Sequence, residues 1–375
     1  METSDFFKTH PMNRRKFLTG TVAAVSAAAL LPLEAKEPAA QSGKTRSSNP
    51  DSPDAMEQHV ADCTAAMLCM QRAPWEQGVA VIAMLISGQE ANIVRLSHEA
   101  VLRQTKDGRL GVMGSTNTST DPMVAGAGVM AAWRISGEER FKTAADKLYD
   151  YCKHTATRGA NGAFYHFLNS KQMWSDSIFM APLFLAAYGD FDDAMQQVKG
   201  YHEILWLEDK QMYGHKWDDS RQAFSRRDCW GSGNGWAASS MAILHEILPA
   251  DRKADRDLTA RYAREVIDGC LKHLRPDGLF HDVVDDPSTF VETNLPQMLA
   301  FTIYKGVHDG WLDRSYLVQA ERMRNAARSK TDAFGIVHDA CGSPSFNSPG
   351  TSTEAQAYAV MMEYMRLQLT RKKMI

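Results

Sequence analysis

A short loop pattern, a glycine beside an aromatic or large apolar residue, recurs five times along the chain. The copies are Asp107-Gly108-Arg109-Leu110, Asn161-Gly162-Ala163-Phe164, Met212-Tyr213-Gly214-His215, Asp277-Gly278-Leu279-Phe280 and Phe334-Gly335-Ile336. Their glycines stand 54, 52, 64 and 57 residues apart, and a step of that size holds two helices and a loop. A repeat at this period is typical of an array of helical hairpins.

Between these loops, apolar residues recur at the spacing of a helix, as Phe141, Leu148 and Cys152 do on one face. Twelve helices are predicted, at residues 55–72, 75–88, 91–105, 122–136, 138–155, 175–189, 191–206, 233–248, 254–274, 289–308, 313–329 and 352–369. Six hairpins of this kind predict an all-α (α/α)6 barrel spanning residues 55–375, with the glycine loops at one rim. Binding and chemistry are expected on such loops. An open superhelical solenoid is the alternative.

The composition limits the class of partner. The chain has 375 residues, with 42 basic and 45 acidic side chains and a net charge of −3, and no dense basic stretch that would bind nucleic acid. Eight Trp and eleven Tyr suit either stacking on sugar rings or a large aromatic core. Six Cys with no CxxC pair predict mostly buried free thiols and no zinc site.

The N-terminus predicts export. Arg14 and Arg15 precede an uncharged run from Leu18 to Leu33, which is typical of a twin-arginine signal over residues 1–35. The run is marginal for spanning a bilayer, so no stable membrane span is expected in a mature protein located in the periplasm or secreted. Residues 36–54 are rich in Pro, Ser, Ala and Lys and are predicted to form a disordered linker.

Two aspartates stand at predicted helix starts. Asp176 follows Trp174 and precedes an apolar helix, and Asp121 opens another helix 55 residues earlier. Each could simply cap its helix. However, the repeat would bring them together at the rim, where an apolar neighbour and a second carboxylate raise the pKa of an acid. Asp176 is therefore predicted to keep its proton and act as a general acid, with Asp121 as its partner.

Two further stretches suggest a binding site. His215 lies in a loop two residues before Trp217, and the run Trp230-Gly231-Ser232-Gly233-Asn234-Gly235-Trp236 leads straight into a helix. Glycines let a backbone approach a ligand closely, and a helix start can bind an anion. The alternative is a tight turn between two core aromatics. The residues predicted to bind substrate are Trp75, Trp174, His215, Trp217, Trp230, Ser232, Gly233, Asn234 and Trp236.

Taken in order, the motifs resemble a known family. Gln172-Met173-Trp174-x-Asp176, Tyr213-x-His215-x-Trp217-Asp218, Trp230-Gly231-x-Gly233-Asn234-Gly235-Trp236, Gly278-Leu279-Phe280-His281 and Gly350-Thr351-Ser352-x-Glu354 are all present. This pattern is similar to the unsaturated rhamnogalacturonyl hydrolases of glycoside hydrolase family 105, which are (α/α)6 barrels related to the unsaturated glucuronyl hydrolases. The resemblance covers roughly residues 60–370.

The resemblance implies a hydrolase that removes a 4,5-unsaturated uronic acid from the non-reducing end of lyase-generated oligosaccharides, without metal or organic cofactor. By position, Asp176 resembles the general acid that protonates C4 of the double bond, and Asp121 resembles its partner. The chain departs from the family at Ser232, where many members carry an arginine that resembles a clamp for the uronate carboxylate. The backbone of the glycine-rich turn, Arg226 or Arg227 could replace that arginine, or the substrate could differ.

Two other functions remain compatible with the sequence. The same barrel could hydrolyse saturated glucuronides by direct displacement, in which case two carboxyl groups must leave room for a water. It could also bind carbohydrate without turning it over.

Overall fold

A computed structural model describes residues 49–114, 116–343 and 345–375. The predicted signal at 1–35 and most of the predicted linker lie outside these residues. Within the described part the chain forms twelve α-helices: α1 (Pro53–Leu68), α2 (Pro74–Ile86), α3 (Glu90–Leu102), α4 (Ala125–Ser136), α5 (Glu139–His154), α6 (Ser177–Tyr188), α7 (Phe191–Leu205), α8 (Gly231–Ile247), α9 (Lys253–Leu271), α10 (Asn294–His308), α11 (Leu317–Arg328) and α12 (Thr353–Arg371). All twelve predicted helices are confirmed. The largest shift is at α10, where residues 289–293 form a turn and a strand instead.

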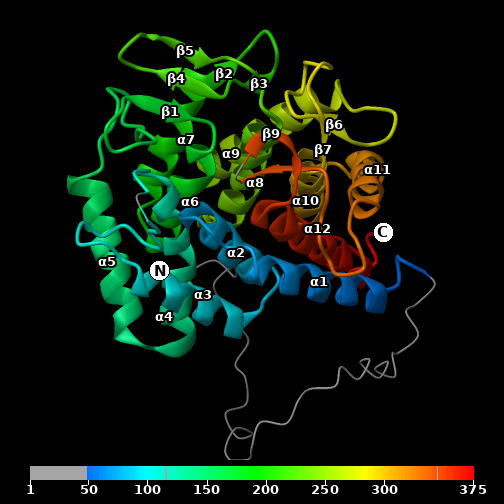
Figure 1. The fold of residues 1–375 in the computed structure, drawn as a ribbon, viewed down its shortest axis with the longest axis horizontal. Coiled ribbons are helices and arrows are strands. Elements are labelled where there is room, and N and C mark those ends of the chain that lie inside the picture. Colours follow the sequence, from blue (N-terminus) through cyan, green and yellow to red (C-terminus); the bar gives the residue numbers. More distant parts are fainter. Residues whose placement is uncertain (1–48, 115, 344) are drawn as a thin grey trace, which may run out of the picture.

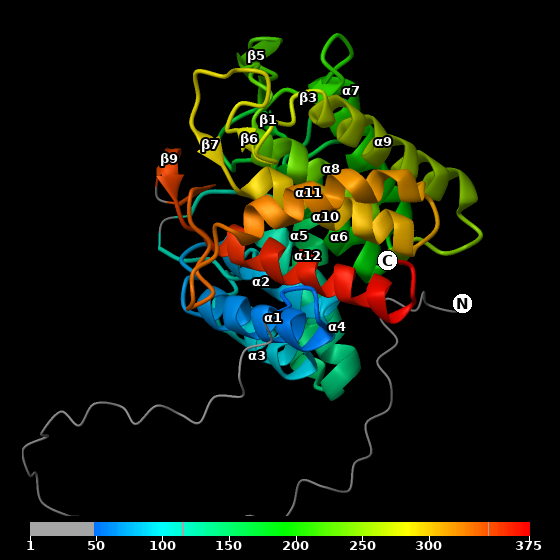
Figure 2. The same cartoon turned by 90° about the vertical axis from the view of Figure 1, so that its right-hand side faces the viewer.

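The helices form two concentric rings (Figures 1 and 2). The inner ring contains the six even-numbered helices, and each of them contacts the next, from α2 through α4, α6, α8 and α10 to α12, which packs back on α2. Each odd-numbered helix packs outside an inner one, and α1 covers α12. The inner helices are correspondingly buried on most sides, and α6 and α8 are buried along nearly their whole length. The ring is therefore a closed (α/α)6 barrel, as predicted, and not an open solenoid.

Every inner helix after α2 begins just after one of the long loops, so these loops gather at one rim of the barrel. Short antiparallel strands, which the sequence did not predict, order them: β1 (Gln172–Trp174), β2 (Trp206–Leu207), β3 (Met212–Tyr213), β4 (Lys216–Asp218), β5 (Ala223–Arg226), β6 (Phe280–His281), β7 (Val291–Glu292), β8 (Ala340–Gly342) and β9 (Ser345–Gly350). They form one three-stranded sheet, β1-β4-β5, and the pairs β2-β3, β6-β7 and β8-β9. Figure 2 shows β7 and β9 at the same end of the barrel.

The backbone conformation and close contacts of the repeated glycines explain why glycine recurs at the period of the helical hairpins. Gly108 and Gly335 have φ of 102° and 78°, a region that disfavours any residue with a Cβ. A Cβ on Gly108 would also lie 2.3 Å from the backbone oxygen of Lys147 on α5, and one on Gly335 would lie 2.3 Å from the backbone of Asp62 on α1. At Gly108, Gly162 and Gly278 the loop therefore rests on the outer helix of the following hairpin, and at Gly335 the last loop rests on the first helix and closes the ring. Gly214 differs, because its close neighbour is Phe224 of its own loop.

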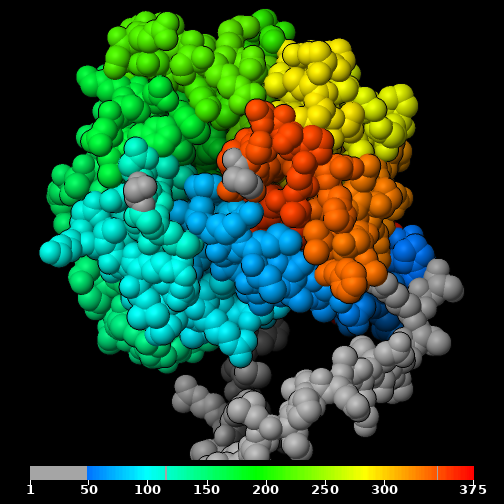
Figure 3. Space-filling view, in the orientation of Figure 1, coloured from blue at the N-terminus to red at the C-terminus, as the bar shows by residue number. Residues whose placement is uncertain are grey.

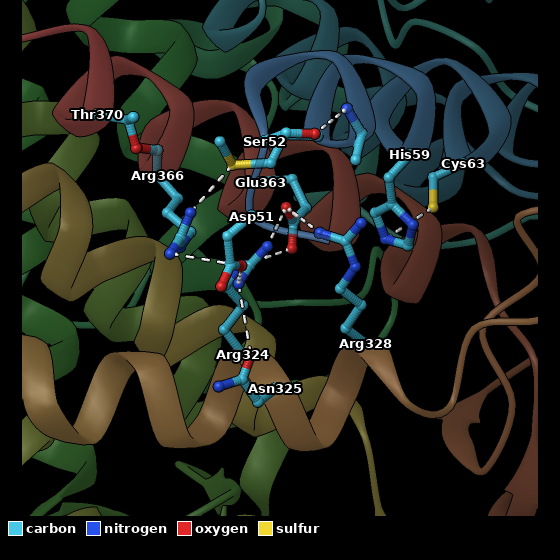
Figure 4. A network of polar contacts seen from close by, with 12 residues as sticks. Asp51, Ser52, His59, Cys63, Arg324, Asn325, Arg328, Glu363, Arg366 and Thr370 are labelled. Carbon is cyan, nitrogen blue, oxygen red and sulfur yellow. Dashed lines mark hydrogen bonds and ion pairs between the residues drawn. The ribbon is translucent and has the colours of Figure 1, made fainter. Parts of the chain in front are cut away.

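A buried ion network fastens the two ends of the domain (Figure 4). Arg324 on α11 donates two hydrogen bonds to Glu363 on α12, at 2.7 and 2.9 Å, and a third to Asp51, which precedes α1. Arg328 adds a bond of 2.9 Å to Glu363, whose side chain is fully buried. Asp51 is thus anchored, and α1 begins at Pro53. The predicted disordered linker is wrong over residues 49–54, because its last residues are bonded to the barrel.

Five of the six cysteines are buried free thiols and Cys69 is exposed, in agreement with the prediction. Burial raises the pKa of these thiols, to about 12 at Cys229, which keeps them unreactive. Over the described ranges, no helix combines the length and the apolar character that crossing a membrane would require.

Candidate active site

A pocket opens at the rim where the inner helices begin. Its volume is about 240 Å³, below the roughly 300–1,000 Å³ of pockets for drug-sized ligands and suited to a single sugar ring. It is lined by Trp75, Thr118, Asp121, His166, Phe167, Trp174, Asp176, Met180, Trp230, Trp236, Phe346 and Glu354. Figure 3 shows the barrel face hollowed where the blue, green and orange-red parts of the chain meet.

Both predicted aspartates line this pocket, and neither is used as a helix cap. Asp176 stands at the N-terminus of α6 and Asp121 opens a short 3-10 helix, Asp121–Met123, ahead of α4. Neither side chain makes a capping hydrogen bond to the described backbone. Because capping would use the carboxyl oxygens, its absence leaves both groups available to a ligand.

The two carboxyls hold their protons in the opposite order to the prediction. Burial, followed by the charge of Asp176, raises the pKa of Asp121 to about 8. Burial also raises the pKa of Asp176, but the contact with His215 outweighs it, and the net pKa lies below the usual value. At neutral pH the pair therefore holds one proton, which resides on Asp121. Trp174 does not make Asp176 the protonated member, because His215 stabilises its charge.

His215 is held in one protonation state by its two neighbours. Its Nδ1 lies 3.1 Å from Arg226 Nη1, and since a guanidinium can only donate, Nδ1 must accept. The proton then sits on Nε2, which lies 3.3 Å from Asp176 Oδ2. Burial, together with the charges of Lys216 and Arg226, lowers the pKa of His215. His215 is thus a neutral imidazole whose Nε2 lies beside an ionised Asp176.

Replacement of Arg226 by Met is expected to raise the pKa of His215, because it removes one of the cations that disfavour the imidazolium. The imidazole signals of His215 in an NMR titration measure this directly. Arg227→Met is the matched control, since Arg227 bonds Asp209 on the exposed surface and should leave the titration unchanged. An identical His215 titration in wild type and Arg226→Met would refute the assignment.

Aromatic rings form most of the remaining wall. Trp174 stacks on His166 with ring centroids 4.3 Å apart and planes inclined by 8°. Trp230 stacks on His215 at 4.5 Å and donates from Nε1 to Asp282 Oδ1 at 3.0 Å. With Trp75 and Trp236 also in the lining, four of the predicted tryptophans surround the pocket. Rings of this kind present apolar faces and edges to a sugar.

Five residues predicted to bind substrate do not line the pocket. One of them, His215, contacts Asp176 instead, with Nε2 3.3 Å from Oδ2. Asn234 is fully buried and bonds the backbone of Tyr213 and Trp230. Ser232 accepts a hydrogen bond from Asn294 at 3.2 Å. A Cβ on Gly233 would lie 2.3 Å from Ser175 Oγ. These predictions are corrected: the glycine-rich turn lets α8 pack closely against its neighbours. Trp217 packs edge-on against Phe224 within the β1-β4-β5 sheet and is likewise outside the lining.

Six lining residues were not predicted as site residues from the sequence: Thr118, His166, Phe167, Met180, Phe346 and Glu354. His166 bonds Thr120 and Ser177 through Nδ1, and burial lowers its pKa to about 4. Glu354 accepts from Trp75 Nε1 at 2.5 Å, and burial and the charge of Glu76 raise its pKa to about 7. Phe346 comes from β9. Glu354 belongs to a quoted motif, and His166 follows the loop copy Asn161-Gly162-Ala163-Phe164 by two residues, which was the signal available for them. No set of three or more His, Cys, Asp or Glu side chains in the described ranges is arranged to hold a metal ion.

The chain is similar in sequence to known carbohydrate-active enzymes. Residues 52–367 match Glycosyl Hydrolase Family 88. The chain belongs to this family. This family 88 chain is 26% identical over 178 residues to the unsaturated rhamnogalacturonyl hydrolase YesR of Bacillus subtilis, which covers 43% of the chain and 50% of that relative. It is 24% identical over 159 residues to an unsaturated 3S-rhamnoglycuronyl hydrolase of Formosa agariphila, covering 38% and 42%. The matched regions thus span half or less of these curated relatives.

Solved structures share the fold of the family 88 chain. A possible member of the GH105 family from Salmonella enterica superposes with a TM-score of 0.75 at 17% identity, covering 85% of this chain and 95% of that one. The unsaturated glucuronyl hydrolase from Bacillus sp. GL1 superposes with a TM-score of 0.62 at 14% identity, covering 84% and 97%. The predicted resemblance and the (α/α)6 architecture are therefore confirmed.

Proposed function

We propose that this family 88 chain removes a 4,5-unsaturated uronic acid from the non-reducing end of oligosaccharides generated by a polysaccharide lyase. The observation that carries the proposal is that Asp121 and Asp176 line the same tryptophan-lined pocket, of a size suited to one sugar ring, with the pKa of Asp121 raised to about 8 and the pKa of Asp176 lowered. The names of both curated relatives join a rhamnose to an unsaturated uronic acid, which favours rhamnose as the neighbouring sugar.

In the proposed reaction, the carboxyl pair delivers its proton to C4 of the C4=C5 double bond, through Asp176. Positive charge develops at C5 and the ring oxygen, and a water molecule adds at C5 while the ionised pair takes up one of its protons. The hemiketal formed at C5 opens, the bond from C1 to the neighbouring sugar breaks, and that sugar leaves with a hydroxyl group. One water is consumed and the pair ends with the proton it began with.

His215 and Asp121 have distinct tasks in this scheme. The neutral Nε2–H of His215 faces Asp176 Oδ2 at 3.3 Å and stabilises Asp176 whenever it is ionised. Asp121 stores the proton in the free protein because its surroundings are more strongly desolvated. An approaching uronate adds a negative charge to the pocket and raises the pKa of both carboxyls, so the proton is retained in the complex, where it passes from Asp121 to Asp176 and on to the substrate.

The proposal is tested by following the ultraviolet absorbance of the conjugated double bond. Lyase-cut rhamnogalacturonan, polygalacturonan and glycosaminoglycan oligosaccharides are incubated with the protein, and loss of absorbance is expected on at least one of them. Saturated versions of the same disaccharides provide the comparison. Turnover of the saturated compounds alone would indicate direct displacement, and tight binding without turnover of either would indicate a carbohydrate-binding protein.

Activity is expected to fall at alkaline pH because the pair then loses its proton. Asp121 has its pKa raised to about 8, so kcat/KM should decrease about tenfold per pH unit above that value. Glu354 also titrates near neutral pH, so the profile is repeated in Glu354→Gln, which removes that second contribution. An unchanged kcat/KM between pH 7 and pH 10 would contradict the role given to Asp121.

We further propose export through the twin-arginine route, supported by Arg14 and Arg15 ahead of the uncharged run and by buried free thiols that fit folding in a reducing compartment. Replacement of both arginines by Lys is expected to retain the protein in the cytoplasm, as measured by cell fractionation of a bacterial host. Unchanged export of that variant would exclude this route.

A further inference from the structure

The pocket contains acidic groups and no fixed cation. Asp121, Asp176 and Glu354 line it, and none of the described lining residues is Lys or Arg. His166 is neutral at neutral pH because burial lowers its pKa to about 4. A uronic acid brings its own carboxylate, and a buried carboxylate needs a cationic partner. The cationic partner of the uronate carboxylate must therefore be a residue just outside the pocket lining.

Lys216 occupies the position next to the pocket wall. It lies on β4, paired with Trp174 on β1 and with Arg226 on β5, so the three side chains form a row across the sheet. Its Nζ lies 3.6 Å from the centroid of the Trp174 ring, and that ring lines the pocket beside Asp176. Burial lowers the pKa of Lys216 while the charge of Asp176 raises it, which places this ammonium within electrostatic range of the reacting carboxyls.

Among the described residues, no carboxylate lies within ion-pair distance of Lys216, in contrast to the neighbouring arginines. Arg226 bonds Asp228 through Nε at 2.9 Å and His215 through Nη1. Arg227 is paired with Asp209. Both arginines are therefore engaged, whereas a half-buried ammonium that contacts only a ring face can still gain an anionic partner.

We propose that Lys216 binds the carboxylate of the substrate uronic acid and thereby selects acidic sugars over neutral ones. This inference rests on the proposed function, since it concerns the acid group of that substrate. The cation is supplied by the β1-β4-β5 sheet at the rim, rather than by the glycine-rich turn at Ser232, which is occupied by packing. Lys216 acts as a point charge, a suitable partner for a carboxylate that approaches over an aromatic wall.

The test compares an acidic substrate with its neutral derivative. Lys216→Met keeps the aliphatic contact with Trp174 but removes the charge. For an unsaturated uronyl disaccharide, KM is expected to rise about 10- to 100-fold with kcat little changed, whereas KM for the methyl ester of the same disaccharide should not change. Lys216→Arg should retain most of the affinity for the acid. Lys171→Met, which alters an exposed lysine at the start of β1, is the matched control.

A binding measurement separates this inference from the proposed reaction. Calorimetry with D-glucuronate and with D-glucose requires no turnover, and wild type should prefer glucuronate while Lys216→Met should not. If wild type consumes no unsaturated substrate but Lys216→Met still loses the preference, the proposed reaction fails and the carboxylate site stands. If the preference is absent in wild type, or survives in Lys216→Met, or if KM rises equally for acid and ester, Lys216 is only a packing residue.

Discussion

Replacement of Asp176 by Asn is expected to lower kcat about 10³- to 10⁴-fold, while the barrel remains folded. General acid–base catalysis by a positioned group is worth up to about four orders of magnitude, and an amide cannot deliver or accept the proton. Asn has nearly the same shape, and it can keep an oxygen at the position of Asp176 Oδ2, 3.3 Å from His215 Nε2. KM should change little, because the variant loses the group that transfers the proton but keeps the side chains that contact the sugar.

Two controls make the Asp176 result specific. Asp218→Asn alters a carboxylate of the same sheet that lies outside the pocket lining and bonds Ser220, and it should keep full activity. Circular dichroism and thermal unfolding of Asp176→Asn should match wild type, since this side chain makes no capping bond to α6. Full activity in Asp176→Asn would remove this residue from the reaction, whatever the effect of Asp121.

The barrel could be predicted from the sequence because its repeat has a steric cause that is visible in single residues. Gly108 and Gly335 are required by close contact with the next outer helix, so glycine recurs at the hairpin period. The short strands could not be predicted, because β2, β3, β4, β6 and β7 are only two or three residues long, too short to show an alternating pattern. Their register, which sets Trp174 beside Lys216, depends on loops from separate hairpins.

The site could be predicted where a residue opens an inner helix. Asp121, Asp176, Trp75 and Trp230 all stand at such helix starts, and the repeat brings these starts to one rim. The glycine-rich turn after Trp230 was misinterpreted, because glycines needed for close helix packing look the same in a sequence as glycines that admit a ligand. Only the three-dimensional contacts of Asn234 and Gly233 distinguish the two.

The position of the shared proton could not be read from sequence neighbours. Trp174 is adjacent to Asp176 in the chain, which suggested an apolar environment, but the decisive contact is with His215, 39 residues later. The histidine beside Asp121, His166, lies farther away at 3.9 Å, and burial with the charge of Asp176 raises the pKa of Asp121, so this residue keeps the proton. The contact between Asp176 and His215, which are far apart in the sequence, thus reversed the prediction that Asp176 keeps its proton.

Removal of the Glu363 carboxyl is expected to cause the largest loss of stability outside the pocket. Glu363→Ala leaves Arg324, which is fully buried, without the acceptor of two of its hydrogen bonds, and Arg328 loses its bond as well. Breaking a buried ion pair from one side costs about 3–5 kcal/mol, equivalent to a decrease in Tm of roughly 5–15 °C for a domain of this size. The free energy of unfolding measured in denaturant, together with the Tm, tests the expected loss of stability.

The same network predicts how the loss can be reversed. A double variant, Glu363→Leu with Arg324→Leu, removes the uncompensated charge and should recover much of the stability, because apolar replacement of a buried pair is often neutral or better. Glu57→Gln is the matched surface control, since its pair with Arg371 is about half exposed and is worth roughly 0–1 kcal/mol. Equal effects of Glu363→Ala and Glu57→Gln would show that the network does not hold α11 and α12 to the segment before α1. A large effect of Glu363→Ala alone would mean instead that the buried network holds α11 against α12, with Asp51 bonded to the same Arg324.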